Sequence, residues 1–174
     1  MGRVTTIGHG ARSSDELLAC LTEAGVRTLV DVRRFPGSGR HPQFGREALA
    51  AAVERAGIVY RHAVELGGRR TGEPGEERFG CIRVAAFRSY AARMAAPEWQ
   101  HALAVALEEP APCFLCAETL WWRCHRRLIA ELLDARGWEV VHLLRPGHSE
   151  PHRAWEPISE TRGGVLYLCG EAVA

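Results

Sequence analysis

The sequence predicts a single three-layer α/β domain in which helices cover both faces of a mainly parallel sheet. Short apolar runs alternate along the chain with amphipathic segments, a pattern typical of βαβ units. One helix separates the first two apolar runs, which favours parallel pairing of those strands. The length of 174 residues suits one core, predicted at about residues 5–145, followed by an irregular extension over 146–174.

The individual elements follow from apolar periodicity and from turn residues. Ser13, Ser14 and Asp15 offer N-caps for a first helix that ends before Gly25. Prolines and glycines interrupt two long loops, at 34–44 and 66–80. Strands are predicted at 3–7, 28–33, 58–62, 112–116 and 138–144, with an added edge strand at 164–169. Further helices are predicted at 46–56, 82–95, 97–107 and 123–135.

Composition and charge narrow the possible functions. A net charge of +1 argues against broad electrostatic wrapping of nucleic acid, although all 22 basic residues are arginines, whose planar groups suit carboxylates and phosphates. No apolar run approaches the roughly 18 residues of a membrane span, and the N-terminus lacks the apolar core of a secretory signal. The sequence therefore predicts a cytoplasmic protein with no membrane partner. It does not indicate the oligomeric state.

The six cysteines are interpreted as candidates for catalysis or metal binding, because a chain of this length does not need covalent cross-links to fold. They stand at positions 20, 81, 113, 116, 124 and 169. Cys113, Cys116, Cys124 and His125 also permit a zinc or iron–sulfur interpretation. Alternation along a strand would point Cys113 and Cys116 to opposite faces, so no cofactor is predicted.

Polar residues follow the ends of several predicted strands. In an open α/β sheet the ligand crevice lies at the carboxyl ends of the strands, so the residues just past each strand are the main candidates. These residues are His9, Asp31, Arg33, His62, Cys116 and Glu118. We expect them to meet at one rim of the sheet.

The most informative segment covers residues 111–127, where a strand ends at Cys116 and a helix begins near Cys124. A thiol that faces a helix N-terminus and arginines has a lowered pKa. Cys116 is therefore predicted to be a nucleophile, with packing in the core as the alternative. Cys124 either resolves a bond to Cys116, contributes to a metal site or packs in the core.

Ionisable side chains near these cysteines supply further candidates. Glu118 and His9 are predicted to transfer protons. The alternatives are a helix-capping role for Glu118 and a backbone-bonded imidazole for His9. His125 and Arg126, at the start of the helix, suit the binding of an anion. A position on the helix surface is the alternative for Arg126.

Two other segments contribute candidate binding residues. Asp31 and Arg33 alternate with valines and point the same way, so they either bind a ligand or pair with each other. Arg40 and His41 lie in the Gly/Pro-rich loop, which either closes over a bound anion or stays solvated. Trp121, with its neighbour Trp122, either stacks on a base or sugar or packs beneath its loop.

Several of these motifs together resemble the bacterial domain-of-unknown-function family number 488, over roughly residues 5–145. The motifs are Thr6-Ile-Gly-His9, Leu29-Val-Asp-Val-Arg33 with Pro36, Leu66-Gly-Gly68, Cys116-Ala-Glu118 and Cys124-His-Arg126. The resemblance implies the fold but no established reaction. The chain has Gly10 where that family usually has serine, and Trp121 where it usually has proline. A weaker likeness to rhodanese and cysteine-phosphatase domains rests on the segments around Asp31 and Cys116.

Together these observations predict a cytosolic enzyme that acts on a small anionic molecule, for example one resembling a nucleotide. A thiol-dependent hydrolase or transferase fits, with Cys116 as nucleophile and the 34–44 loop over the site. One alternative is a nucleic-acid-binding or nucleic-acid-processing module that uses the arginine-rich loops and Trp121. The other is a metal-binding protein that uses Cys116, Cys124 and a histidine.

Overall fold

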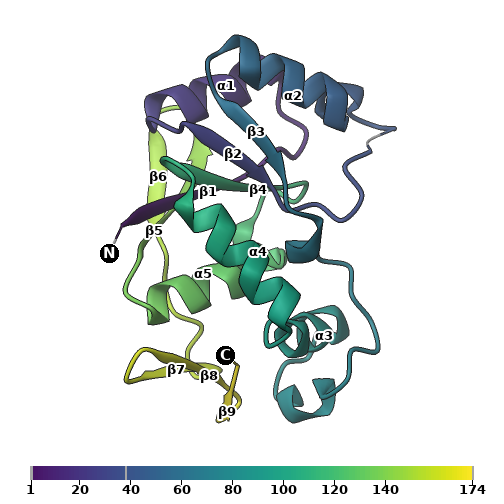
Figure 1. Cartoon of the computed structure of the whole chain (residues 1–174), viewed down its shortest axis with the longest axis vertical. Helices are drawn as coiled ribbons and strands as arrows, with labels where there is room; N and C mark the ends of the chain where they lie inside the picture. The colour runs from purple at the N-terminus through teal and green to yellow at the C-terminus, as the bar shows by residue number, and fades with distance from the viewer. Residues whose placement is uncertain (1, 38, 174) are drawn as a thin grey trace.

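A computed structural model describes residues 2–37 and 39–173, and it confirms the predicted α/β class with a mainly parallel sheet. The main sheet has the strand order β3-β2-β4-β1-β5-β6 (Figure 1). Its strands are β1 Arg3–Gly8, β2 Thr28–Asp31, β3 Val59–His62, β4 Pro112–Cys116, β5 Glu139–Arg145 and β6 His148–Pro151. The first five run parallel and β6 pairs antiparallel with β5.

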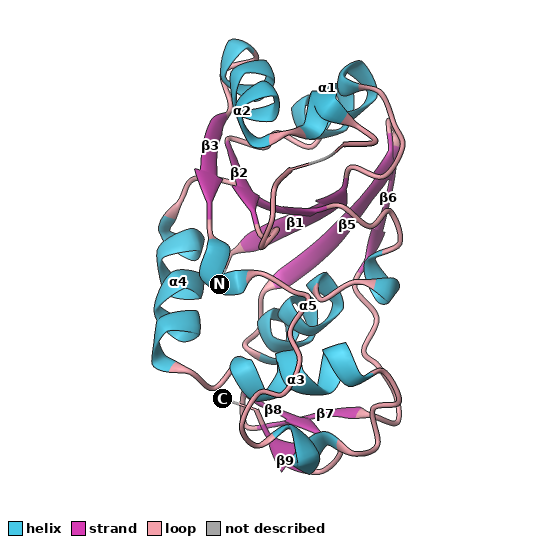
Figure 2. Ribbon diagram, turned by 90° about the vertical axis from the view of Figure 1, so that its right-hand side faces the viewer, coloured by secondary structure: helices cyan, strands magenta, loops and turns pink. Residues whose placement is uncertain are grey.

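Helices cover both faces of this sheet (Figure 2). One side, named here the α1–α2 face, carries α1 Ser14–Glu23 and α2 Arg46–Arg55. The other, named the α3–α5 face, carries α3 Ala85–Arg93, α4 Pro97–Glu108 and α5 Arg126–Ala135. Each face has its own hydrophobic core, so the sheet separates two sets of buried side chains. Among the described residues no helix has the length and apolar character to span a membrane.

The central strands are apolar on both faces because helices bury them from both sides, which is usual for parallel sheets. Strand β4 inserts between β1 and β2, with Gly8 opposite Cys116 and Asp31 opposite Leu115. This order brings the carboxyl ends of three strands that are distant in sequence to the middle of one rim. The candidate polar residues follow those ends.

Element boundaries differ from the predictions where local turns intervene. The last helix begins at Arg126, three residues later than predicted, because residues 121–123 form a 3₁₀ turn and Cys124 is extended, with φ −128° and ψ 156°. The helix predicted from residue 82 begins at Ala85. Ser13 caps the first helix as predicted, since its hydroxyl accepts a hydrogen bond from the backbone N–H of Glu16 at 3.1 Å.

The C-terminal residues are more regular than the sequence predicted. Strands β7 Ser159–Arg162, β8 Val165–Leu168 and β9 Glu171–Ala172 form a separate antiparallel sheet, which lies beyond α5 and α3 in Figure 2. The prediction that residues 164–169 extend the main sheet was wrong, since β6 forms that edge instead. Leu166 and Leu168 are buried in the α3–α5 core, and this burial holds the small sheet against α5.

The interpretation of the cysteines also needs one correction. Cys81 and Cys169 form a disulfide that connects the segment before α3 to the small sheet. The sequence signal was weak because the two residues are 88 positions apart and belong to no motif. Cys20, Cys113, Cys116 and Cys124 are free and buried. The three cysteines between residues 113 and 124 are therefore all free.

Candidate functional site

The predicted rim exists in the backbone, but its side chains divide between the two faces of the sheet. The backbone N–H of His9 donates to the carbonyl of Cys116 at 2.9 Å, and that of Val32 donates to Leu115 at 2.9 Å. Successive residues of a strand point to opposite faces. Asp31 therefore joins the α1–α2 side with His9 and Arg33, whereas Cys116 belongs to the α3–α5 core.

The first group, named here the aspartate cluster, consists of His9, Asp31, Arg33, Phe44 and Tyr60. Asp31 is fully buried, and its carboxylate accepts hydrogen bonds from Arg33 Nε at 2.8 Å and from the Tyr60 hydroxyl at 2.6 Å. Arg33 also donates to the carbonyl of Phe44 at 2.7 Å. Burial and the neighbouring Asp31 carboxylate raise the pKa of Tyr60. Of the two interpretations left open for Asp31 and Arg33, the structure shows pairing with each other.

His9 is held in one orientation within this cluster. Its ring stacks on Phe44 at a centroid distance of 4.5 Å. Its Nε2 lies 3.3 Å from Arg33 Nη1, and because arginine only donates, Nε2 accepts and Nδ1–H donates to the carbonyl of Gly10 at 2.9 Å. Burial, followed by the positive charge of Arg33, lowers the pKa of His9 to about 4. The imidazole is therefore neutral at pH 7, and both ring nitrogens have partners.

The 34–44 loop contacts the aspartate cluster. Its Phe44 carries the stacked His9 ring, and the ring of His41 lies 6.4 Å from that of His9. Arg40 is exposed. Phe44 of this loop thus contacts both His9 and Arg33 on the α1–α2 side of the sheet.

The second group, named here the thiol cluster, consists of Thr6, Cys116, Cys124, His125 and Arg126. The sulfur atoms of Cys116 and Cys124 lie 2.6 Å apart. Arg126 donates from Nε to Cys116 Sγ at 2.9 Å, and its backbone N–H points to Cys124 Sγ at 3.5 Å. His125 Nδ1 lies 3.4 Å from Cys124 Sγ. The end of a strand and the start of a helix therefore bring two thiols, an imidazole and a guanidinium group together.

Ionisation of one sulfur opposes ionisation of the other, because two negative charges at this separation repel each other strongly. Burial raises the pKa of Cys116 well above its ordinary value, and so does the hydrogen bond between the two sulfurs, in which Cys116 is the protonated partner. Burial alone would also raise the pKa of Cys124. The hydrogen bond from Cys116 and the charges of His125 and Arg126 outweigh that effect and lower it well below the ordinary value. The prediction of a lowered thiol pKa therefore applies to Cys124, and for Cys116 it was wrong.

Arg126 is buried and its charge is committed within the protein. Besides Cys116 it donates to the Thr6 hydroxyl at 3.3 Å, and to the carbonyls of Glu118 at 2.5 Å and Thr119 at 3.3 Å. The contribution of Glu118 to the cluster is its carbonyl oxygen. Its exposed carboxylate accepts a hydrogen bond from the backbone of Leu120 at 3.4 Å and so supports the turn.

Trp121 packs beneath its loop. Its indole stacks on His142 at 4.1 Å, with an interplanar angle of 7°, and its N–H donates to Glu150 Oε1 at 2.5 Å. The neighbouring Trp122 is exposed. Of the two interpretations of Trp121, the structure shows packing inside the protein.

Sequence reasoning gave no role in the site to Thr6 of the thiol cluster or to His142 and Gly68, which lie beside it. The Thr6 hydroxyl accepts a hydrogen bond from Arg126, and His142 Nδ1 lies 2.7 Å from the same hydroxyl. Burial, followed by the nearby His152 and Arg126, lowers the pKa of His142 to about 2. Gly68 lies so close to His125 that an added Cβ would be 2.5 Å from Nδ1. The available signals were the motifs Thr6-Ile-Gly-His9 and Leu66-Gly-Gly68, and the close approach of His125 explains the second glycine of the latter.

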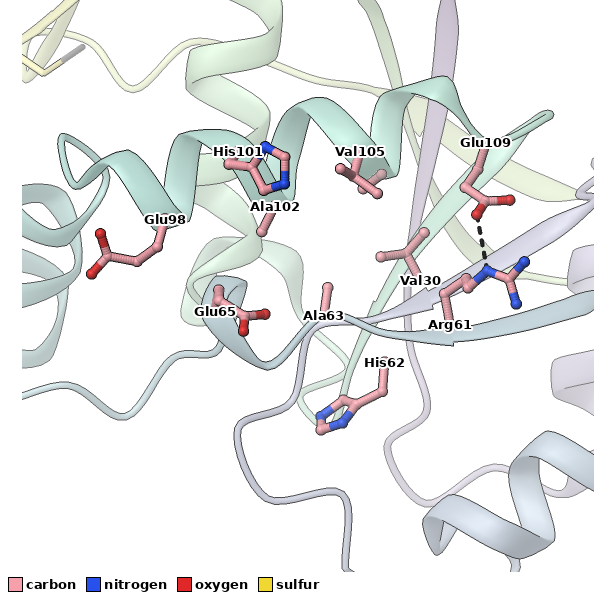
Figure 3. A pocket seen from close by; sticks show the side chains of 11 residues that line it. Val30, Arg61, His62, Ala63, Glu65, Glu98, His101, Ala102, Val105 and Glu109 are labelled. Carbon is pink, nitrogen blue, oxygen red and sulfur yellow. Dashed lines mark hydrogen bonds and ion pairs between the residues drawn. The ribbon is translucent and has the colours of Figure 1, made fainter.

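A cavity of about 370 Å³ lies on the α3–α5 side, between α4 and the end of β3 (Figure 3). Its apolar surface includes Val30, Ala102 and Val105, and Figure 3 shows Glu98 at one end and Arg61 bonded to Glu109 at the other. The sulfurs of the thiol cluster do not line it. The volume alone therefore does not identify the chemistry.

The cysteines do not converge as a metal site would require. Cys113 lies in the α1–α2 core and Cys116 in the α3–α5 core, as strand alternation predicts. Among residues 2–37 and 39–173, no three histidine, cysteine, aspartate or glutamate side chains gather as ligands for one ion. The free thiols that meet are Cys116 and Cys124.

Comparison with known proteins gives one match. A family model described as Domain of unknown function DUF488 matches residues 13–133, which cover more than half of the chain and include both clusters apart from Thr6 and His9. Comparison with curated proteins and with solved structures found no match. The match agrees with the family resemblance carried by the sequence motifs.

Proposed function

Because this chain belongs to the DUF488 family, a domain of unknown function, we propose its activity from the geometry of the site: a thiol-dependent enzyme whose reactive group is the Cys116–Cys124 pair. The observation that supports it is the contact of Arg126 Nε with Cys116 Sγ at 2.9 Å, while Cys124 Sγ lies 2.6 Å from the same sulfur. A buried positive charge beside paired thiols stabilises one thiolate, which is the nucleophilic form.

The arrangement suits nucleophilic substitution by a hydrolase or transferase. Cys124 Sγ⁻ forms a bond to an electrophilic atom of the substrate, and the bond to the leaving group breaks. The leaving group takes the bonding electrons and the proton of Cys116. Arg126 then stabilises the new thiolate on Cys116. In the second step water or an acceptor hydroxyl forms a bond to the group held on Cys124, its proton passes to Cys116, and the bond to Cys124 breaks and restores the thiolate there. Cys124, rather than Cys116, is thus the proposed nucleophile.

Alkylation by iodoacetamide between pH 5 and pH 9, followed residue by residue with peptide mass spectrometry, tests this proposal. An ordinary thiol has its midpoint at about pH 8.5. We expect the midpoint of Cys124 to lie below that value. Cys113 is an internal control, because burial raises its pKa to about 12. The proposal is lost if Cys124 titrates like an ordinary thiol or reacts no faster than Cys113.

Matched variants locate the cause. The substitution Cys116→Ala removes the hydrogen-bond donor beside Cys124, so the midpoint of Cys124 should rise. The substitution Cys113→Ala changes the same strand on the other face and should leave that midpoint unchanged. Equal shifts in the two variants would indicate a general effect on the strand and contradict the role given to Cys116.

A further inference from the structure

Two arginines donate hydrogen bonds to backbone carbonyls of the loop that packs against the thiol cluster, and the positive charge of a third lowers the pKa of one of them. The loop begins at Leu66, whose carbonyl accepts a hydrogen bond from the Tyr90 hydroxyl at 2.7 Å. The ring of Tyr90 lies 5.1 Å from that of His125, and Gly68 touches the same imidazole. A group bound on this loop would therefore lie close to Cys124. The three arginines are Arg34, Arg70 and Arg93.

Arg70 is the central one. Its side chain is 13% exposed, and its guanidinium donates to the carbonyls of Gly67 at 3.0 Å and Glu65 at 3.3 Å. The carboxylate of Glu73 is its ion-pair partner, with Oε1 at 3.6 Å from Arg70 Nη1. Burial, and then the charges of Arg93 and Arg34, lower the pKa of Arg70. This guanidinium therefore lies in a repulsive field that a bound anion would relieve.

Arg93 and Arg34 complete the group. The side chain of Arg93 is 20% exposed and pairs with the exposed Glu98 at 2.8 Å, but its buried Nε has no hydrogen-bond partner in the described part of the chain. Arg34 packs its backbone against Gly67 and donates to the carbonyl of Arg69 at 3.3 Å. Buried donors without acceptors are costly, so the arrangement favours an acceptor-rich ligand.

We propose that Arg34, Arg70 and Arg93 bind the phosphate of a small phosphomonoester substrate. Guanidinium groups fit phosphate oxygens with paired hydrogen bonds, and a dianion balances several of them better than a carboxylate does. Of the arginines that the sequence suggested for anion binding, Arg33 and Arg126 donate to buried partners within the protein, whereas Arg40 is exposed in the 34–44 loop. The link to catalysis depends on the proposed thiol function, whereas binding of the anion does not.

Calorimetric titration of the whole chain with inorganic phosphate, at constant ionic strength set with chloride, tests the site. We expect phosphate binding that weakens by about tenfold or more in Arg70→Gln and in Arg34→Gln, because each change removes a charged donor. Arg34→Lys keeps the charge and should retain most of the affinity. Arg55→Gln, on the far side at the end of α2, is the matched control and should bind as the unchanged chain does.

Arg34 is exposed, so its substitution tests the site even if Arg70→Gln loosens the loop. Equal affinity in Arg34→Gln, Arg55→Gln and the unchanged chain would overturn the proposal, as would absence of phosphate binding. Phosphate binding with an unreactive Cys124 would retain this site and reject the thiol function. A reactive Cys124 without phosphate binding would do the reverse.

Discussion

His9 and Cys116 share a backbone hydrogen bond of 2.9 Å, yet their side chains lie on opposite faces of the sheet. The sheet itself therefore separates the imidazole from the sulfur. His9 cannot act as the base for Cys116 across this barrier. Proton transfer at the thiols must use groups on the α3–α5 face, where Cys116 contacts Cys124 and Cys124 contacts His125.

Replacement of Arg126 should raise the pH at which Cys124 becomes reactive. In Arg126→Met the thiolate loses its positive neighbour, and removal of an opposite charge at this range shifts a pKa by roughly 1 to 3 units. Alkylation of Cys124 as a function of pH, in the variant and in the unchanged chain, measures the shift. Circular dichroism shows whether the variant is folded, because a buried arginine with several partners also contributes to stability.

Two further variants separate the effect of the direct contact of Arg126 with the sulfurs from the effect of positive charge nearby. Arg126→Lys keeps the positive charge and should shift the profile less than Arg126→Met. Arg123→Met removes an exposed arginine of the preceding turn and should leave the profile unchanged. A shift as large in Arg123→Met as in Arg126→Met would show that the direct contact is unimportant.

A methyl group at position 68 should disturb the site. In Gly68→Ala the new Cβ would lie 2.5 Å from His125 Nδ1, so either the loop or the imidazole must move. Overpacking of this kind costs about 1 to 3 kcal/mol of unfolding free energy. Gly37→Ala meets no atom within 4 Å and should change stability by less than about 0.5 kcal/mol. Urea denaturation compares the two, and equal stabilities would contradict the close packing.

Buried His9 should make the protein less stable as the pH falls from about 6.5 to 4. Its pKa is lowered to about 4 in the folded state, so over this range the unfolded chain binds the extra proton. The stability lost to His9 is at most about 3 kcal/mol at pH 4. Urea denaturation of the unchanged chain and of His9→Gln measures it as the pH-dependent part of their difference. Parallel curves would show that His9 titrates alike in both states.

The Cys81–Cys169 disulfide should stabilise the attachment of the small sheet. Replacement of both residues by alanine is expected to cost about 2 to 4 kcal/mol, since the cross-link closes a long loop. Thermal denaturation with and without dithiothreitol is the measurement. The reductant should lower the midpoint of the unchanged chain to that of the double variant and leave the variant unaffected. An identical response of both proteins would mean that other thiols are responsible.

Much of the fold was predictable because its signals are local. The 112–116 strand was predicted with its observed bounds, since a short apolar run between proline and polar residues has few other solutions. The start of α5 was placed too early, because Trp121 and its neighbours form a 3₁₀ turn that apolar periodicity does not reveal. The disulfide and strand β6 were missed because each depends on contacts between distant segments.

The candidate site shows the same division. Proximity of Cys124 to Cys116 was one of the interpretations that the motif allowed, and Asp31 with Arg33 was correctly seen as a possible pair. The role of Trp121, the lowered pKa of Cys124 and the contact of Gly68 with His125 required coordinates. Each depends on which side chains share a core, and only strand order and register decide that.

The sequence by itself determined the α/β class, the family and the rim where polar residues follow strand ends, because these depend on periodicity and on the order of elements. Tertiary structure alone decided that the rim residues form two clusters, one around Asp31 and one around Cys116. The physical reason is the two-residue period of a strand: neighbours along the chain point to opposite faces, so closeness in the backbone does not bring side chains together.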